Sequence, residues 1–218
     1  MTDELRRILS FGKLHWPRQQ FFLEQRRMIE SVALNEETVV VAGNKLGKDY
    51  AASFVCLVFF LAPWLFFPRS KFEGLERRRE ETGEPEHLVH TRKIVTTSVK
   101  EKHLVNLWGE IGRLLSTSAV PLLESRGGPL TVNAFEIRLK QEAEVKKPIN
   151  YLIGQVAQQE ESMAGWHAEY TLFVADEASS LWANVYQQIL GCAKKRLLFG
   201  NPNPSAFFES LVRGGDVI

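Results

Sequence analysis

A lysine and two acidic residues follow apolar runs that lie far apart in the sequence, and their types suit phosphate chemistry. The segment VVVAGNKLGKD begins with three valines and contains the pair Gly47-Lys48. Its spacing resembles G-x-x-x-x-G-K-[ST], in which backbone N–H groups surround phosphate oxygens and the lysine pairs with the β- and γ-phosphates. An ordinary strand-to-helix turn is the alternative interpretation of this segment alone. The predicted phosphate-binding residues are Ala42, Gly43, Asn44, Lys45, Leu46, Gly47, Lys48 and Asp49.

Two positions depart from the phosphate-loop pattern. Ala42 replaces the first glycine, and Asp49 replaces the serine or threonine whose hydroxyl normally binds Mg²⁺. An acid at position 49 places a negative charge near phosphates, but a carboxylate is also a hard oxygen ligand that Mg²⁺ accepts. Aspartate also suits the first turn of a helix. Asp49 is therefore either an unusual metal ligand or a helix cap turned away from the metal.

A second motif, TLFVADEAS, places two acids at the end of an apolar strand. Ligand sites of parallel sheets lie at the carboxyl edge, where Asp176 and Glu177 are expected. We predict that Asp176 holds Mg²⁺, directly or through water. The adjacent Glu177 is expected to point the other way and to polarise an attacking water. Two exposed acids that end a strand are the alternative, but the order of the two motifs favours ATP binding and hydrolysis.

A third motif, LLFGNPNP, again follows an apolar strand. It places Asn201 at the same predicted edge, where its side chain could sense the γ-phosphate or the attacking water. A plain Asn-Pro turn is the alternative. The predicted catalytic residues are Glu177, Lys48 and Asn201.

The elements that must position these residues alternate between strands and helices. A helical segment over 1–35 precedes a buried strand at 36–43, and an apolar helix starts at about Asp49. Further helices are expected at 101–115 and 181–190. The polar segment 68–87 is expected to be a solvated excursion, part of it helical. This alternation predicts an α/β fold with a mainly parallel sheet. The remaining predicted strands cover 92–98, 135–141, 150–157, 170–179 and 195–204.

Composition narrows the class of protein. The 218 residues suit one large domain or two small ones, and the formal net charge of +1 means that any nucleic-acid surface must be a local patch. Arg77, Arg78 and Arg79 form the densest basic cluster, but flanking glutamates favour a solvated loop. The apolar run 51–67 contains Pro63 and is shorter than the roughly 20 residues of a membrane span, which favours a buried core helix. The five histidines show no zinc-binding spacing.

Together the three motifs resemble the ATPase domain of a large terminase, the motor that packages viral double-stranded DNA into a procapsid. The likeness rests on the phosphate loop and on two further segments. These are FVADEAS (173–179) and FGNPNP (199–204), and the latter is similar to the family's coupling motif. Upstream, HWPRQQFFLEQ (15–25) resembles the glutamine motif that recognises adenine. Gln19 or Gln20 could fill that role, and Gln19 is favoured. The resemblance covers residues 15–210.

The resemblance implies a P-loop NTPase fold of the ASCE type, with a helical segment at 1–35 that carries the glutamine motif and an ATPase core at 36–218. It also implies ATP and Mg²⁺ as cofactors. The implied partners are double-stranded DNA, a homo-oligomeric ring on a portal protein and a small terminase subunit, with no membrane, in the host cell cytoplasm. The family's nuclease domain is expected to be absent. Ala164 occupies the family's arginine-finger position, which leaves Arg126, Arg138 and Arg196 as candidates. A helicase-like nucleic-acid ATPase and a non-catalytic nucleotide-binding module are the alternatives.

Overall fold

A seven-stranded sheet forms the centre of the computed structural model, which describes residues 1–43, 47–157, 167–181, 183–201 and 206–214. The strand order is β1-β7-β6-β2-β5-β4-β3. The first five of these strands are parallel, and β4 and β3 are antiparallel additions at one edge. The predicted mainly parallel α/β sheet is therefore confirmed. The strands are β1 (Glu37–Val41), β2 (Arg92–Ser98), β3 (Leu130–Asn133), β4 (Glu136–Leu139), β5 (Tyr151–Val156), β6 (Tyr170–Asp176) and β7 (Lys195–Gly200).

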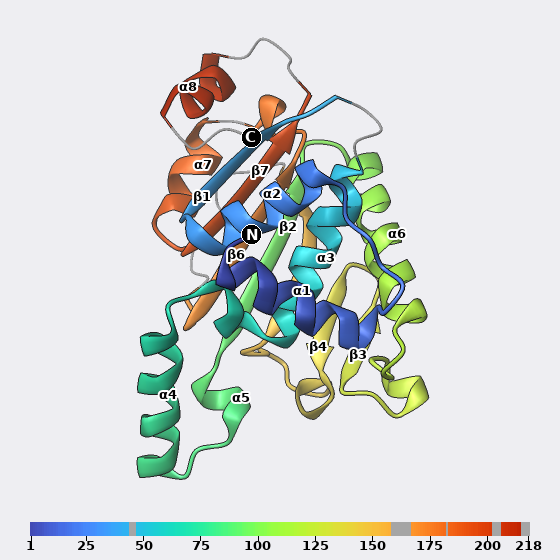
Figure 1. Cartoon of the computed structure of the whole chain (residues 1–218), viewed down its shortest axis with the longest axis vertical. Helices are drawn as coiled ribbons and strands as arrows, with labels where there is room; N and C mark the ends of the chain where they lie inside the picture. The colour runs from blue at the N-terminus through green and yellow to red at the C-terminus, as the bar shows by residue number, and fades with distance from the viewer. Residues whose placement is uncertain (44–46, 158–166, 182, 202–205, 215–218) are drawn as a thin grey trace.

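Helices cover both faces of this sheet (Figure 1). One face packs against α1, α2, α3 and α6, and the other packs against α7 and α8. Side chains of the buried strands alternate between the two cores, as the pleat of a strand requires. The helices are α1 (Asp3–His15), α2 (Leu23–Leu34), α3 (Lys48–Leu61), α4 (Arg69–Thr82), α5 (Glu86–Val89), α6 (Glu101–Thr117), α7 (Ala183–Leu190) and α8 (Ala206–Gly214).

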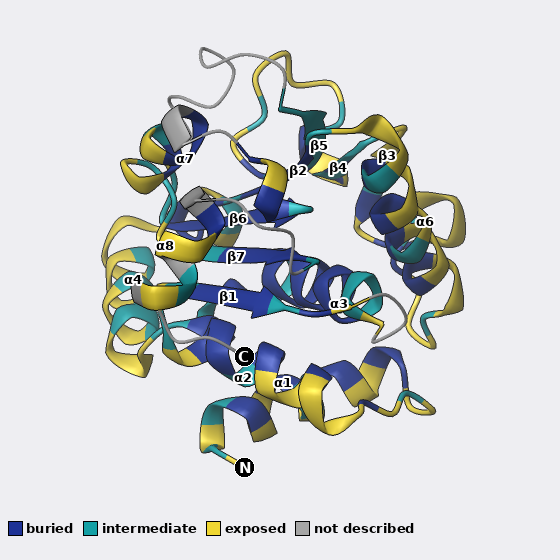
Figure 2. Cartoon of the chain, turned by 90° about the horizontal axis from the view of Figure 1, so that it is seen from above, coloured by how far each residue is buried: buried dark blue, intermediate teal, exposed yellow. Residues whose placement is uncertain are grey.

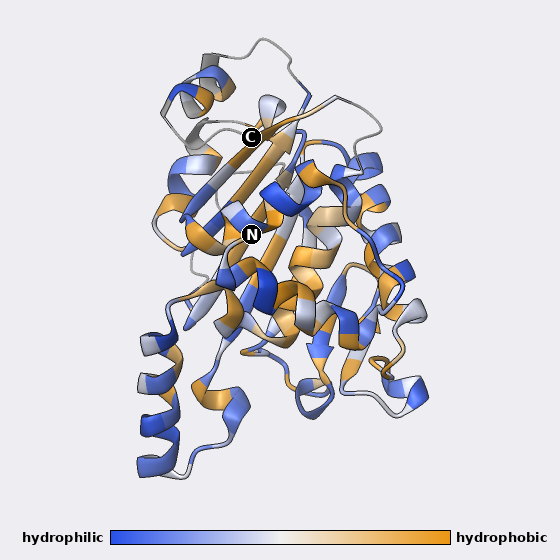
Figure 3. Ribbon diagram, in the orientation of Figure 1, coloured by the Kyte–Doolittle hydropathy of each residue, from blue (hydrophilic) through white to orange (hydrophobic). Residues whose placement is uncertain are grey.

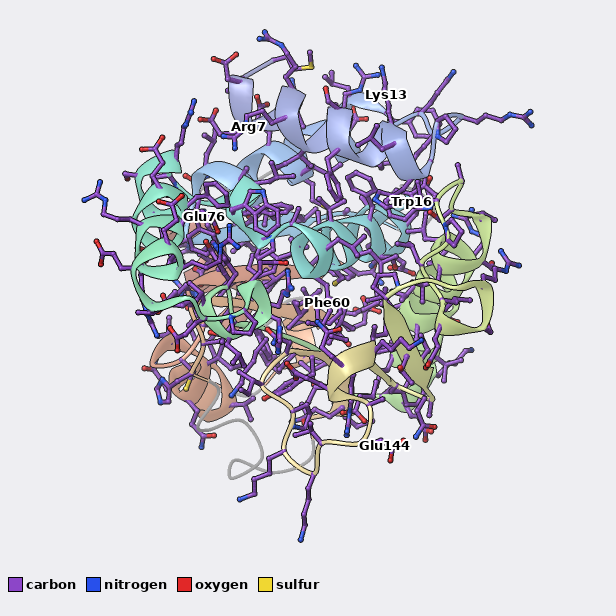
Figure 4. The ribbon with its side chains drawn as sticks, turned by 90° about the horizontal axis from the view of Figure 1, so that it is seen from below. Arg7, Lys13, Trp16, Phe60, Glu76 and Glu144 are labelled. Carbon is purple, nitrogen blue, oxygen red and sulfur yellow. The ribbon has the colours of Figure 1, made fainter. Side chains whose placement is uncertain are left out.

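The apolar run after the phosphate loop forms α3, which is a buried helix as expected. Every residue from Ala51 to Phe60 is buried, and Figure 2 shows this helix in dark blue beside the strands. Phe60 lies inside the molecule, whereas Arg7 and Lys13 point outward from α1 (Figure 4). Each fully buried phenylalanine stabilises the fold by roughly 1.5–3 kcal/mol, so α3 is held firmly behind the loop that precedes it. None of the described helices is long and apolar enough to cross a membrane.

The segment 1–35 contains two helices rather than one. Helix α1 ends at His15, and the following Trp16 takes a non-helical backbone because it precedes Pro17. Helix α2 begins six residues after Pro17, at Leu23. Not every apolar residue of the segment lies in the core, since Phe22 is 74% exposed and Leu23 is 58% exposed.

The polar segment 68–87 is largely helical and solvated. Helix α4 has no buried residue and lies with α5 at one end of the molecule, and it is coloured as hydrophilic in Figure 3. Arg79 pairs with Glu76 at 2.7 Å and Arg78 with Glu84 at 3.2 Å. These internal pairs favour the solvated interpretation of the arginine cluster over a DNA patch.

Strand β3 and helix α8 were not anticipated. Strand β3 has four residues, of which only Leu130 is buried, so its sequence carries little apolar alternation. The last strand, which was predicted within 195–204 and closing on a Pro/Asn turn, is β7 and ends at Gly200. Pro202, Asn203 and Pro204 lie outside the described residues.

Candidate functional site

Three neighbouring parallel strands bring polar residues to one edge and one face of the sheet. Ser98 at the end of β2 pairs in register with Asp176 at the end of β6, and Asp176 pairs with Phe199 of β7. Leu172, Val174 and Phe199 belong to the core beneath α3 and α6. Strand alternation therefore turns Ser98, Asp176 and Asn201 toward that same side.

The phosphate-loop segment joins β1 to α3 across this edge. The backbone N–H of Ala42, which is buried, donates to the carbonyl of Gly200 at 3.1 Å and so ties the start of the loop to β7. Gly47 takes a left-handed conformation with φ 65° and ψ 33°, and α3 begins at Lys48, as predicted. Gly43 is exposed. Asn44, Lys45 and Leu46 lie outside the described residues.

The loop is also fastened to α2 by Gln25, a contact that the sequence did not reveal. The Gln25 Nε2 atom donates to the Gly47 carbonyl at 3.2 Å, while its Oε1 accepts from the backbone N–H of Phe22 at 3.0 Å. A Cβ atom at position 47 would lie 2.5 Å from Gln25 Nε2. Gln25 thus satisfies the backbone N–H of the residue that precedes α2 and the loop carbonyl at the same time.

The three predicted catalytic side chains converge. Lys48 Nζ lies 3.9 Å from Glu177 Oε1, and Asn201 Nδ2 donates to that same oxygen at 3.1 Å. Both Lys48 and Glu177 are largely buried, with side-chain exposures of 12% and 14%. Lys48 Nζ makes no hydrogen bond within the described part of the chain. A buried ammonium without a hydrogen-bond acceptor is suited to receive an anionic ligand.

The expectation that Glu177 points away from Asp176 is wrong. Strand β6 ends at Asp176, and Glu177 has φ 54° and ψ 44°, a left-handed conformation that is uncommon outside glycine. Its backbone N–H donates to Asp176 Oδ1 at 2.8 Å. This turn breaks the alternation of the strand, so both carboxylates face the His103 ring, with Nδ1 3.9 Å from Asp176 Oδ2 and 4.0 Å from Glu177 Oε1.

The carboxyl groups of the site lie close together and are largely removed from water, and both effects raise their pKa values. Asp176 is 3% exposed, and burial, with a contribution from the charge of Asp49, raises its pKa to about 7, against an opposing effect of Lys48. Burial also raises the pKa of Asp49, again opposed by Lys48. The buried Oδ1 atom of Asp49 accepts no hydrogen bond in the described structure, so it caps no helix N–H group. A pair of buried, mutually repelling carboxyls fits a hard divalent cation such as Mg²⁺.

Ser98 and His103 join the site although sequence reasoning did not select them. Ser98 is fully buried, and its Oγ has no hydrogen-bond partner among the described residues. His103 lies in the first turn of α6, five residues after the end of β2. Ser98 ends β2 and His103 follows it closely, which places both near the carboxyl edge of the sheet, but no spacing in the sequence pairs either residue with Asp176 or Glu177.

The two glutamines of the adenine motif differ in environment. Gln20 is exposed, whereas both polar atoms of the Gln19 amide are buried, near the Tyr50 hydroxyl and without a hydrogen bond of good geometry. Gln19, Tyr50 and Arg113 contribute to the lining of a cavity of about 460 Å³. A neighbouring cavity of about 480 Å³ is lined in part by both glutamines.

The candidate finger arginines all have partners within the chain. Arg196 pairs with Glu37 at 3.0 Å at the opposite end of the sheet, and Arg138 pairs with Glu136 at 2.8 Å. Arg126 donates to the Ser116 carbonyl at 2.8 Å. Ala164 lies outside the described residues.

Comparison with known proteins supplies fold-level relatives. No family model matches the sequence, and no curated protein matches it. Among solved structures, a point mutant of the ATPase domain of the Thermus phage P74-26 large terminase is 14% identical with a TM-score of 0.54, over 96% of this chain and 73% of that one. The HK97 bacteriophage large terminase is 11% identical with a TM-score of 0.55, over 100% of this chain and 43% of that one.

The chain has the fold of a large terminase ATPase domain. A structure of S. cerevisiae Dbp5 that contains ADP is also similar, with 10% identity and a TM-score of 0.52 over 100% of this chain and 52% of that one. The terminase-like or helicase-like P-loop fold predicted from the motifs is thereby confirmed. The chain spans less than half of the HK97 terminase and about half of Dbp5.

Proposed function

We propose that this chain is the ATP-hydrolysing motor domain of a large terminase, which drives viral double-stranded DNA into a procapsid. The observation that carries the proposal is the convergence of Lys48, Glu177 and Asn201, in which Glu177 Oε1 lies 3.9 Å from Lys48 Nζ and accepts from Asn201 Nδ2 at 3.1 Å. These three residues come from three different elements that the terminase-like fold brings to one sheet edge. Double-stranded DNA, a portal protein and a small terminase subunit are the proposed partners, in the host cytoplasm.

Each residue has a role that follows from its position. The Lys48 ammonium, largely buried and without a hydrogen-bond acceptor, pairs with the β- and γ-phosphates of ATP. Glu177 orients the attacking water and accepts its proton, while Asn201 fixes the Glu177 carboxylate through the bond to Oε1. Because Asn201 directly follows β7, a change at the γ-phosphate is passed through Glu177 to the end of that strand, and this is the proposed origin of coupling.

Asp176 and Asp49 are the proposed holders of Mg²⁺. The raised pKa values of both carboxyls and the unpartnered Oδ1 of Asp49 support this assignment, because a cation would offset their repulsion. A bound Mg²⁺ would neutralise the phosphate charge that develops during transfer. Asp49 then takes the place of the usual hydroxyl ligand.

The cavity beside Gln19 is the proposed adenine site. Its volume of about 460 Å³ lies within the range of small-ligand sites, and the buried Gln19 amide offers both a donor and an acceptor to a base edge. Gln20, which is exposed, is the weaker candidate.

Substitution of Glu177 tests the catalytic proposal. The Glu177→Gln variant is expected to bind ATP with the affinity of the unchanged protein but to hydrolyse it about 10²–10⁴ times more slowly, which is the usual contribution of general-base catalysis. Lys48→Ala is expected to lose ATP affinity, and Glu144→Gln, at an exposed position, serves as the matched control. Phosphate release with and without Mg²⁺ measures turnover. Unchanged hydrolysis in both Lys48→Ala and Glu177→Gln would exclude the catalytic assignment. ATP binding without turnover in the unchanged protein would favour a non-catalytic nucleotide-binding module.

A helicase-like nucleic-acid ATPase is the second candidate, supported by the similarity to Dbp5. The two candidates differ in what they do to a duplex. A packaging motor is expected to displace a third strand from triplex DNA without separating the duplex, whereas a helicase releases a labelled strand. Strand release without triplex displacement would favour the helicase-like alternative.

A further inference from the structure

Three potential metal ligands from two elements meet at the carboxyl edge of the sheet. His103 Nδ1 from α6 lies 3.9 Å from Asp176 Oδ2 and 4.0 Å from Glu177 Oε1. One ligand atom from each residue lies within 4.8 Å of the other two, and within the described ranges this is the one such group of histidine, cysteine and acidic side chains. Asp176 is buried, while His103 and Glu177 are partly accessible, so an ion can reach the cluster from solvent.

Two polar atoms beside this cluster lack hydrogen-bond partners, although Glu177 Oε1 itself accepts from Asn201 Nδ2. Ser98 Oγ is fully buried on the same face of the sheet, one strand away from Asp176, and has no partner among the described residues. Asp49 Oδ1 is also buried and unpartnered, and its charge acts on Asp176. Buried polar atoms are nearly always satisfied in native proteins, so unmet groups around three ligand atoms indicate a place for a bound species.

The separations of His103 Nδ1 from the two carboxylate oxygens are close to those between the ligands of a bound metal ion. Zinc binds nitrogen and oxygen at about 2.0–2.2 Å, so tetrahedral ligands lie about 3.4 Å apart. Separations of 3.9 and 4.0 Å therefore need to close by about half an ångström each. A side-chain rotation of His103, whose exposure is 33%, would bring its ring closer to the two carboxylates.

We propose that His103, Asp176 and Glu177 form a binding site for a divalent transition metal, Zn²⁺ above all, in the nucleotide-free protein. One imidazole with two carboxylates suits Zn²⁺ or Co²⁺, whereas Mg²⁺ takes oxygen ligands and gains nothing from His103. The site is thus distinct in its ligands from the proposed Mg²⁺ site of the ATP-bound protein, although the two share Asp176. A metal held by Glu177 would keep that carboxylate from the attacking water, so it would inhibit hydrolysis; this consequence alone rests on the proposed function.

Cobalt titration of the untagged, nucleotide-free chain tests the site directly, because tetrahedral Co²⁺ absorbs visible light and competition with Zn²⁺ then gives the zinc affinity. The wild-type protein is expected to bind one Co²⁺ that Zn²⁺ displaces. His103→Gln is expected to weaken binding at least about tenfold, since even the loss of a group that only hydrogen-bonds a metal ligand costs about 10–100-fold in metal affinity. His167→Gln, at an exposed histidine remote from the cluster, is the matched control and is expected to bind as the wild type does.

The outcomes separate this proposal from the proposed function. Equal Co²⁺ binding by wild type and His103→Gln, or no binding by the wild type, would overturn the metal site. Binding that His103→Gln abolishes would support it even if the chain hydrolysed no ATP, because the titration contains no nucleotide. Circular dichroism of both variants without metal shows whether a loss of binding reflects a lost ligand or a lost fold.

Discussion

Replacing Gly47 with alanine is expected to cost more stability than a left-handed backbone alone explains. Gly47 has φ 65°, and an L-residue in this conformation costs about 1–2 kcal/mol. The new Cβ would lie 2.5 Å from Gln25 Nε2, so the amide has to move and give up its bond to the Gly47 carbonyl. Loss of that bond adds about 0.5–1.5 kcal/mol. The expected decrease in the free energy of unfolding is therefore about 1.5–3.5 kcal/mol.

Gly83 provides the matched control for this prediction. Its φ is 69°, almost that of Gly47, but nothing lies within 4 Å of a Cβ added there. Gly83→Ala therefore carries the backbone cost alone, about 1–2 kcal/mol. Urea denaturation followed by circular dichroism measures both variants. The Gln25→Ala background should reduce the cost of Gly47→Ala, because contacting residues are not additive.

A Gly47→Ala protein that loses no more stability than Gly83→Ala would refute the contact between Gln25 and the loop. The same contact predicts a functional effect, since the loop that Gln25 fastens also carries Lys48. Gly47→Ala is thus expected to weaken ATP binding, measured by calorimetry, whereas Gly83→Ala in the remote α4 turn leaves ATP binding unchanged.

Two further predictions concern buried carboxyls. Without nucleotide or metal, the free energy of unfolding should fall as pH rises from about 4 to about 7. The reason is that Asp176 ionises near its ordinary pKa of 3.8 in the unfolded chain, whereas in the folded chain burial raises its pKa to about 7 and it keeps its proton over that range. Asp176→Asn should flatten this fall in urea denaturation at several pH values, and an unchanged slope would contradict the shift. Glu142 is 4% exposed and accepts from the backbone N–H groups of Ile149 and Asn150 at 2.9 Å each. Glu142→Ala should therefore cost about 1–3 kcal/mol, chiefly by leaving the buried Asn150 donor without an acceptor. The exposed Glu144 (Figure 4) is its control, and equal losses for Glu142→Ala and Glu144→Ala would contradict that estimate.

The strands and the meeting of the catalytic residues were predictable because they follow from one rule. Apolar runs that end in a polar residue form parallel strands, and the carboxyl ends of parallel strands share an edge. The valines of β1 and the run before Asp176 were sufficient to place Lys48, Asp176 and Asn201 near one another. The helix after Lys48 was equally clear, since it is apolar on all sides and must be buried.

The contacts that refine the site were not predictable in the same way. Gln25 and His103 reach it from helices whose orientation depends on tertiary packing, and no spacing in the sequence encodes that packing. The direction of the Glu177 side chain was predicted wrongly for a local reason, because strand alternation turns it away from Asp176 unless its backbone becomes left-handed. Strand β3 was missed because it has only one buried side chain to mark it.

The positions of the buried polar atoms that lack a hydrogen bond indicate where a ligand could bind. Among the described residues, the buried side-chain atoms without a hydrogen bond include Lys48 Nζ, Asp49 Oδ1, Ser98 Oγ, Ser179 Oγ and Asn201 Oδ1, all at or next to the carboxyl edge of the sheet. Each buried donor or acceptor without a hydrogen bond lowers the stability of the folded chain by about 1–3 kcal/mol. Four such atoms lie elsewhere, at the Gln19 amide, Arg92 Nε and Gln188 Oε1, whereas Glu142 and Asn150 are hydrogen-bonded to each other. Five of the nine unpartnered buried atoms in the described residues therefore lie at one edge of the sheet, which supports this edge as a place that binds phosphate, metal or both.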